Sequence, residues 1–417
     1  MTSAPAPSYR LFEVVGLELE YPVVDGRLEP QCLVEPAFRW FHGRPTSDIE
    51  FDNVGFSNEL AAHVFEIKTV EPVRSLDRAE RQLVSGLRRF SGVLQARFGA
   101  RLLPTGMHPF MRPDATALWP RAGQRIYRTY DRIFGIRGHG WLNVQASHVN
   151  LPFGTEEETV AMHNAIACLL PYLPALAASS PIYEGRIGPY VDNRLAFYRT
   201  NQRRIPRITG DVIPEFVGSF REYRSRILKP IYRDLDGIPG GDVIQHEWVN
   251  SRGAIVRFMR RAIEIRVLDV QECVRADVAI AVFVRGALRW MVEEIRSGAL
   301  SLPDHRTLVA DFGRTIRHGG GARVTAPHLA PTPRARHRTA RHVLEWLLER
   351  AESHVARPER SYLPLIADRL RRGCLSEQIT AAVRARAPRA GAAQHGAIGE
   401  IYEELAGCLQ RNETWDP

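Results

Sequence analysis

Charged side chains recur at every second position in three short segments of the sequence. Because successive side chains of a β-strand point to opposite faces, residues two apart project from the same face, about 6 to 7 Å from each other. The residues between them are apolar, which predicts strands with one polar and one buried face. The three pairs are Glu18 and Glu20 in residues 11–22, Glu66 and Lys68 in residues 64–70, and Glu264 and Arg266 in residues 261–269.

An acidic strand of this kind is, taken alone, more often the solvated outer face of a sheet. The repetition favours another interpretation. If the three strands share one sheet with their polar faces together, the carboxylates converge, and they would repel one another without cations. Mg²⁺ suits such a site because this hard ion binds carboxylate and phosphate oxygens together, so ATP is its natural companion. Neighbouring arginines can then pair with a phosphate or a substrate carboxylate through two parallel hydrogen bonds.

Other nucleotide-binding and catalytic signatures are missing from the sequence. It has no GxxxxGK[ST] loop and no GxGxxG placed between a strand and a helix, so neither the P-loop nor the Rossmann scaffold accounts for nucleotide binding. It also lacks HExxH, GxSxG and a Cys–His nucleophile signature. The predicted site therefore depends on metal ions.

Hydrophobic periodicity predicts an α+β chain whose last third is almost wholly helical. Antiparallel strands with covering helices imply a catalytic domain, residues 1–325, and a helical C-terminal region, residues 326–417, packed on it. Residues 27–57 form a long connection rich in Pro and Gly, and residues 317–321 and 326–333 form a linker. We expect helices at 76–98, 159–170, 277–295, 340–355, 362–371 and 376–384, and further strands at 101–103 and 141–151.

The strand predicted over residues 141–151 changes its polar face part-way. Asn143, Gln145 and Ser147 share one side, whereas His148 and Asn150 share the other. A β-bulge at the change of face would bring both sets to the site. The alternative, that some of these side chains simply cap the edge of the sheet, stays open.

Six motifs together resemble those of the glutamate–cysteine ligase type 2 family, one of the glutamine-synthetase-like carboxylate–amine ligases. They occur in the family's order and cover roughly residues 10 to 290, so the ordered set is specific although each motif alone is weak. They lie at residues 16–20 (GLELE), 64–73 (VFEIKTVEPV), 105–110 (TGMHPF), 147–151 (SHVNL), 178–186 (ASSPIYEGR, with Arg194 after it) and 263–269 (IEIRVLD).

The resemblance implies a concave, mainly antiparallel sheet of the glutamine synthetase and guanido kinase type. Its acids would hold two or three Mg²⁺ ions, with Mn²⁺ as an alternative, between ATP and an amino-acid carboxylate. Catalytic positions are matched by Arg266 and Arg194. The implied metal ligands are Glu18, Glu20, Glu59, Glu66, Glu264 and His148. The implied substrate or nucleotide contacts are Lys68, His108, Asn150, Arg186 and Gln145.

The activity that the resemblance implies is ATP-dependent amide formation through an acyl phosphate. The activated acid would be glutamate, through its γ-carboxylate, and the acceptor cysteine or another amine. Three departures bear on substrate choice: Met107 replaces the usual Thr before His108, Ala62 stands where many members have an acid, and Asn150 replaces a second His. Two rival hypotheses are a phosphagen-kinase-like phosphotransferase and a non-catalytic protein that binds nucleotide or nucleic acid.

Bulk composition narrows the class of protein. With 417 residues, 44% of them hydrophobic and 25% charged, the sequence is that of an ordinary globular protein. The net charge of +9 comes almost wholly from arginines spread along the chain, so nucleic acid is not favoured as a partner. Five scattered cysteines argue against a disulfide framework. Without a secretory signal or an apolar membrane segment, we expect a cytoplasmic protein. A homodimer stays open.

Overall fold

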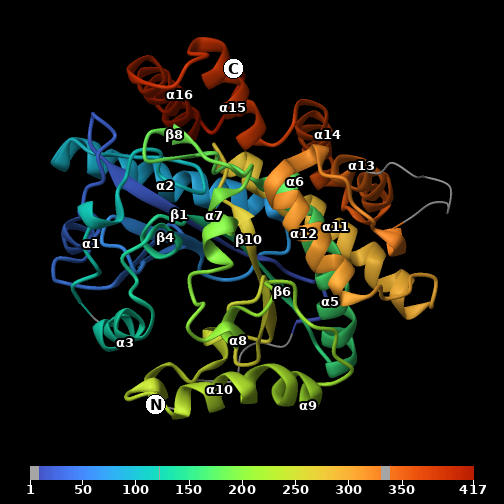
Figure 1. The fold of residues 1–417 in the computed structure, drawn as a ribbon. Coiled ribbons are helices and arrows are strands. Elements are labelled where there is room, and N and C mark those ends of the chain that lie inside the picture. Colours follow the sequence, from blue (N-terminus) through green and yellow to red (C-terminus); the bar gives the residue numbers. More distant parts are fainter. Residues whose placement is uncertain (1–8, 122, 330–338) are drawn as a thin grey trace.

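A central antiparallel sheet organises the computed structural model, which describes residues 9–121, 123–329 and 339–417 (Figure 1). A further strand, β5 (Arg101–Leu102), pairs with the end of β1. In spatial order the other strands are β2 (Asp48–Phe51), β3 (Val54–Asn58), β4 (Val64–Thr69), β1 (Gly16–Val24), β6 (Ala146–Pro152), β10 (Ala262–Asp269) and β9 (Ala254–Arg257).

Long helices cover the apolar face of this sheet. They are α2 (Leu76–Phe98), α5 (Glu156–Leu169) and α11 (Val274–Arg296), and they pack on strands β4, β10 and β6 respectively. Leu17 and Leu19 of β1 are buried on this side, as the alternation predicts. The expected helix at residues 76–98 coincides with α2, which ends at Gly99 in the left-handed conformation that favours glycine.

Shorter helices border the polar face. Figure 1 shows α3 (Gln124–Phe134) and α7 (Asn193–Tyr198) with the segment that carries α8 (Pro206–Thr209), α9 (Phe220–Tyr223) and α10 (Lys229–Asp236). A two-stranded hairpin, β7 (Ile182–Tyr183) and β8 (Arg186–Ile187), is separate from the main sheet. This side of the sheet is therefore walled by loops and short helices, where binding residues commonly lie.

The C-terminal third is helical, as predicted. Its helices are α12 (His305–His318), α13 (Ala340–Ala351), α14 (Leu363–Arg372), α15 (Leu375–Arg386) and α16 (Ala392–Arg411). Helices α13 and α14 share the main hydrophobic core with α11. Helices α15 and α16 bury a second cluster with Val24, Leu28 and Leu103. The boundary at residue 325 stays a prediction, and residues 330–333 of the predicted linker lie outside the described part.

Three expectations about elements are corrected. Residues 27–57 are not one connection: α1 (Val34–His42) buries Val34 and Phe38, and the β2–β3 hairpin extends the sheet. The strand expected from residue 141 begins at 146, because α4 (His139–Leu142) precedes it. The final helix, α16, was missing from the prediction. Its glycines and alanines weaken the amphipathic pattern on which such a prediction depends.

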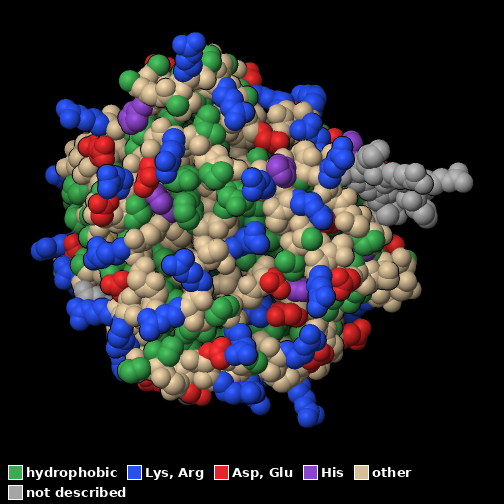
Figure 2. Space-filling view, viewed as in Figure 1, with side chains coloured by type: hydrophobic (Ala, Val, Ile, Leu, Met, Phe, Trp, Pro, Cys, Tyr) green, Lys and Arg blue, Asp and Glu red, His purple; other side chains and the backbone are tan. Residues whose placement is uncertain are grey.

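The surface carries its positive charge in dispersed form. Figure 2 shows Lys and Arg side chains spread over the visible face and interleaved with acids, not gathered in one stripe. The sequence is densest in arginine at residues 334–341, and most of this segment lies outside the described residues. Within the described part of the chain, no helix has the length and apolarity needed to cross a membrane.

Candidate active site

The register of four strands gathers the predicted polar residues on one face of the sheet. Directly opposed residues in antiparallel strands share a face. Glu18 of β1 lies opposite Lys68 on one side and His148 on the other, and Glu20 lies opposite Glu66. Asn150 lies between Gly16 and Glu264, so β10 adds its acid to the same face. The convergence expected from the sequence patterns is therefore present in the structure.

Two groups of ligand atoms on this face are compact enough to hold a metal ion. In the first, ligand atoms of Glu18, Glu66 and His148 lie within 4.8 Å of one another, and in the second those of Glu20, Glu59 and Glu66 do. Glu66 belongs to both. Glu59 follows directly after β3, whose pairing with β4 brings it beside Glu66. These oxygen-rich groups fit the ligand preference of Mg²⁺, and two ions could share the Glu66 carboxylate.

A cavity of about 540 Å³ opens over these acids. The acids Glu18, Glu20, Glu59, Glu66 and Glu264 form part of its wall. Four arginines and three aromatic residues complete most of the remainder: Arg194, Arg257, Arg260, Arg266, Tyr127, Tyr198 and Trp248. A pocket that combines buried carboxylates with guanidinium groups can hold a metal–phosphate complex and an acidic substrate at once.

Burial and mutual repulsion make the acid cluster costly to ionise without a cation. Burial, reinforced by the nearby Glu18, raises the pKa of Glu66 to about 7. Burial together with Glu20 and Glu66 raises the pKa of Glu59 well above its ordinary value. The Lys68 ammonium, 2.8 Å from Glu66 Oε1, opposes this rise only in part. Bound divalent ions would relieve the repulsion, so the donor set fits Mg²⁺.

His148 and the β1 acids form a second electrostatic unit. Although burial alone would raise the pKa of Glu18, the hydrogen bond between its Oε2 and His148 Nδ1, 3.1 Å apart, lowers it overall. The same bond raises the pKa of His148 against the effect of its burial. Glu20 accepts a hydrogen bond of 2.7 Å from the backbone nitrogen of Ala146, but its burial still raises its pKa.

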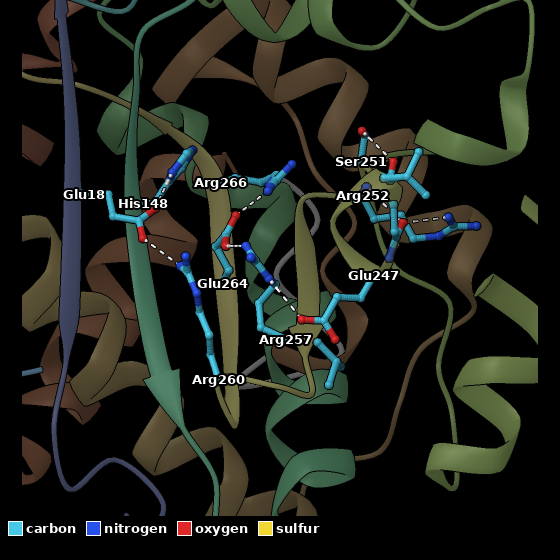
Figure 3. A network of polar contacts seen from close by, with 12 residues as sticks. Glu18, His148, Glu247, Ser251, Arg252, Arg257, Arg260, Glu264 and Arg266 are labelled. Carbon is cyan, nitrogen blue, oxygen red and sulfur yellow. Dashed lines mark hydrogen bonds and ion pairs between the residues drawn. The ribbon is translucent and has the colours of Figure 1, made fainter. Parts of the chain in front are cut away.

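Glu264 lies between two arginines, as Figure 3 shows. Its Oε1 accepts a hydrogen bond from Arg266, and its Oε2 accepts one from Arg257. Burial would raise the pKa of this carboxyl, but Arg266 outweighs it and holds the pKa well below the ordinary range. Arg257 is held from its other side by Glu247, 3.4 Å away. Glu264 therefore stays ionised and fixes both guanidinium groups at the cavity wall.

None of the five predicted contact residues forms part of this cavity wall. Lys68 pairs with Glu66 of the wall, whereas three of the others point elsewhere. His108 is buried in the loop after β5, where its Nδ1 accepts hydrogen bonds from the backbone nitrogens of Phe110 and Met111. Arg186 is exposed on β8 and pairs with Glu184. Gln145 is buried just before β6 and is not among the residues of the cavity wall.

The absence of the expected bulge from β6 explains the position of Gln145. The irregularity in pairing lies in β10, between Ile265 and Leu268, and not in β6. Strand β6 keeps a regular register with β1 from Ser147 to Asn150. Ser147 therefore stays on the apolar side with Leu19 and Leu268. Gln145, two residues before it, shares that side, whereas Ala146 and Val144 line the cavity. Asn150 does lie on the polar face, beyond the cavity wall.

Sequence reasoning missed two arginines at the mouth of the site. Arg257 closes β9, and Arg260 lies in the β9–β10 turn, from which its Nη1 reaches Glu18 Oε1 at 3.4 Å (Figure 3). Arg260 is 54% exposed, so it bridges solvent and site. The signal that could have revealed both is the run of residues 254–269, whose two apolar, alternating halves flank an arginine-rich turn and predict a hairpin.

The resemblance to a known family extends beyond single motifs to nearly the whole sequence. The family model described as glutamate-cysteine ligase family 2 (GCS2) matches residues 14–404. The chain belongs to this family. A relative from Archaeoglobus fulgidus, described as an uncharacterized protein, is 37% identical over 402 residues and aligns with 96% of this chain and with its own entire length.

Solved structures support the family's fold for this chain. The glutamate–cysteine ligase of Francisella tularensis, determined in complex with AMP, superposes with a TM-score of 0.62 at 12% identity, covering 99% of this chain and 91% of that one. A bifunctional glutathione synthetase from Pasteurella multocida gives a TM-score of 0.57 at 15% identity, over 95% of this chain and 52% of the other. The α+β fold with a helical C-terminal region is thereby confirmed.

Membership of glutamate–cysteine ligase family 2 also confirms the class of reaction. The protein is an ATP-dependent carbon–nitrogen ligase that forms an amide. Which acid it activates, which amine accepts it and which residues bind each ligand remain to be argued from the site.

Proposed function

We propose that this ligase activates the γ-carboxylate of glutamate with Mg²⁺–ATP and joins it to an amine, with cysteine as the first acceptor to test. The observation that carries the proposal is the in-register convergence of Glu18, Glu20, Glu66 and Glu264 under a cavity walled by arginines. The choice of glutamate and cysteine rests on the family's name. The arginines of the cavity wall supply the positive charge that an acidic substrate and a polyphosphate require.

In this scheme the two compact acid groups divide the metal-binding work. Glu18, Glu66 and His148 would hold one Mg²⁺, and Glu20, Glu59 and Glu66 another. When bound, these ions would neutralise charge on the phosphate oxygens during transfer. Of the residues first expected to bind metal, only Glu264 lies outside both groups, and it is committed to Arg257 and Arg266. Its proposed role is therefore to hold arginines as much as to bind metal.

The proposed reaction has two steps. A γ-carboxylate oxygen attacks the γ-phosphorus of ATP, the bond to the β-phosphate oxygen breaks, and ADP leaves. The amine nitrogen then attacks the acyl carbon, the carbon–oxygen bond to phosphate breaks, and the nitrogen loses a proton. Arg194 and Arg266 would stabilise negative charge on the transferring phosphate or on the substrate carboxylates, which is where electrostatic catalysis of such transfers acts. No covalent bond to the protein is formed.

The decisive experiment is a screen for ADP release with Mg²⁺, ATP and amino acids supplied singly and in pairs, followed by product mass. We expect release to require glutamate and an amine together, and the product mass to be their sum less one water. A phosphorylated product that accumulates without an amine would favour the phosphagen-kinase-like alternative. Steeply salt-dependent binding of DNA or RNA without ADP release would favour the non-catalytic alternative.

A further inference from the structure

Three of the family-like motifs contribute residues that do not reach the cavity but meet beneath one of its arginines. Gly106 comes from the loop after β5, Ser179 precedes β7, and Asp269 is the last residue of β10. Asp269 pairs with Arg194 of α7, and Gly106 and Ser179 pack against the carboxylate of Asp269. The chemistry proposed above gives these residues no role.

Both carboxylate oxygens of Asp269 are committed. Oδ1 accepts a hydrogen bond from Arg194 Nε in a fully buried ion pair, and Oδ2 accepts one of 2.8 Å from the backbone nitrogen of Ser179. The Ser179 hydroxyl in turn accepts from the backbone nitrogen of Gly106 at 2.8 Å and donates to the carbonyl of Val270 at 2.7 Å. A charged carboxylate held at both oxygens has one orientation.

Because Gly106 has no side chain, the loop backbone can lie directly against the carboxylate of Asp269. A Cβ atom at residue 106 would lie 2.4 Å from Asp269 Cγ, well inside van der Waals contact. The loop backbone therefore packs directly against the carboxylate, which has no exposed surface. Close packing and two hydrogen bonds together prevent Asp269 from turning away from Arg194.

The remaining contacts of Arg194 determine which part of its guanidinium can meet a ligand. Its backbone nitrogen donates to the Ser180 hydroxyl at 3.2 Å, and its Nη2 donates to the carbonyl of Arg266 at 3.4 Å. Among the described residues these contacts engage Nε and Nη2, so Nη1 is the nitrogen left for a ligand. Arg194 is only 2% exposed yet forms part of the cavity wall.

We propose that Asp269 is a positioning residue, which acts through Arg194 to present one edge of that guanidinium to the negatively charged group bound in the cavity. The group is a substrate carboxylate or the transferring phosphate. The inference rests on the proposed function for the part played by Arg194. A lysine at residue 194 would keep the charge but lack the planar fork that can face Asp269 and a ligand together.

A double-mutant cycle tests the proposal. Asp269→Asn and Arg194→Gln are each expected to lower kcat/KM for the acidic substrate at least tenfold, and the double variant to be no worse than Arg194→Gln alone, because the first change acts through the second residue. Losses that multiply in the double variant, or normal kinetics in Asp269→Asn, would overturn it. The matched control is Glu272→Gln, which breaks another buried ion pair, with Arg369, away from the cavity.

Further measurements keep the test decisive if Asp269→Asn does not fold. Arg194→Lys retains the buried charge pair, and its kcat/KM should still fall at least tenfold; wild-type values there would also overturn the proposal. The same variants are compared by calorimetry for binding glutamate and a non-hydrolysable ATP analogue. We expect weaker binding of one of these ligands, even if the product proves not to be an amide. Unchanged affinity for both would count against Asp269, whatever the screen shows about the reaction.

Discussion

At the scale of single residues, the protonation of Glu66 should make stability depend on pH. Its pKa is raised to about 7 in the folded, metal-free protein, above the ordinary value of 4.5. The folded state therefore keeps a proton that the unfolded state releases, and this group lowers stability as pH rises from about 4.5 to 7. The total effect should be about 3 kcal/mol.

The measurement is urea unfolding of the wild type and of Glu66→Gln in chelator, from pH 5 to pH 8. The free energy of unfolding of the variant minus that of the wild type should grow with pH and level off above about 7. Adding Mg²⁺ should stabilise the wild type at pH 8 more than the variant. A difference that stays constant across this range would mean that the buried acids do not repel as described.

Loss of the Glu264 carboxylate should strongly reduce turnover. It holds Arg266 and Arg257 at the cavity wall. Glu264→Gln removes the charge that orients both, so ADP release should fall by about 10²-fold or more. The matched control is Glu247→Gln, which also touches Arg257 but does not form part of the cavity wall. Equal effects of the two changes on turnover, at equal thermal stability, would show that Glu264 does not act by orienting the two arginines.

At the scale of elements, the β9–β10 turn should compete with metal binding. Arg260 and a Mg²⁺ ion would both use Glu18. Arg260→Gln is therefore expected to tighten Mg²⁺ binding, although only by about two- to fivefold because this guanidinium is half exposed. Calorimetric titration without ATP measures the effect, with Arg261→Gln as the control, since Arg261 contacts the carbonyl of Gly154 instead. Weaker Mg²⁺ binding in Arg260→Gln would contradict this account.

The strands and turns of the site also show which features the sequence could predict and which it could not. Period-two alternation identified the polar faces of β1, β4 and β10, because each is a single strand with one apolar side. Register between strands is not a local property, so the separate positions of Gln145 and Asn150 followed only from the structure. The bulge in β10 depends on backbone geometry that no motif encodes, whereas the turn that carries Arg260 has a signal in the two alternating apolar halves of residues 254–269. Glu59, which lies in none of the six motifs, was expected only from its place seven residues before Glu66, where the family often has an acid, and the structure places it beside Glu66.

Among the predicted site residues outside the paired strands, some lie at the cavity and others do not, because their positions also depend on the whole fold. Arg194 was expected at the site and does form part of the cavity wall. Asp269, which pairs with it, was quoted in a motif but was given no role. His108 and Arg186 stood in equally recognisable motifs, yet the structure places them away from the cavity. A motif shows that a residue type recurs, whereas its role depends on which face of the fold it occupies.

At the scale of the whole molecule, a buried ion pair joins the C-terminal region to the helices that cover the sheet. Glu359 pairs with Arg285 of α11 and accepts a hydrogen bond of 2.8 Å from the backbone nitrogen of Leu76, which starts α2. Glu359→Gln leaves Arg285 buried without its counter-charge, so the free energy of unfolding should fall by roughly 3 to 5 kcal/mol. Urea unfolding measures this, with the exposed Glu352→Gln as control; equal stability of the two variants would disprove the link.

The central claim, activation of a carboxylate by phosphoryl transfer followed by amide formation, is tested most directly by following an oxygen atom. Glutamate labelled with ¹⁸O in its γ-carboxylate is supplied with Mg²⁺, ATP and the amine found in the screen, and the inorganic phosphate is analysed by mass. One labelled oxygen should appear in phosphate for each amide formed, because the carboxylate oxygen that attacks the γ-phosphorus leaves with it. Amide formation with unlabelled phosphate would contradict the account.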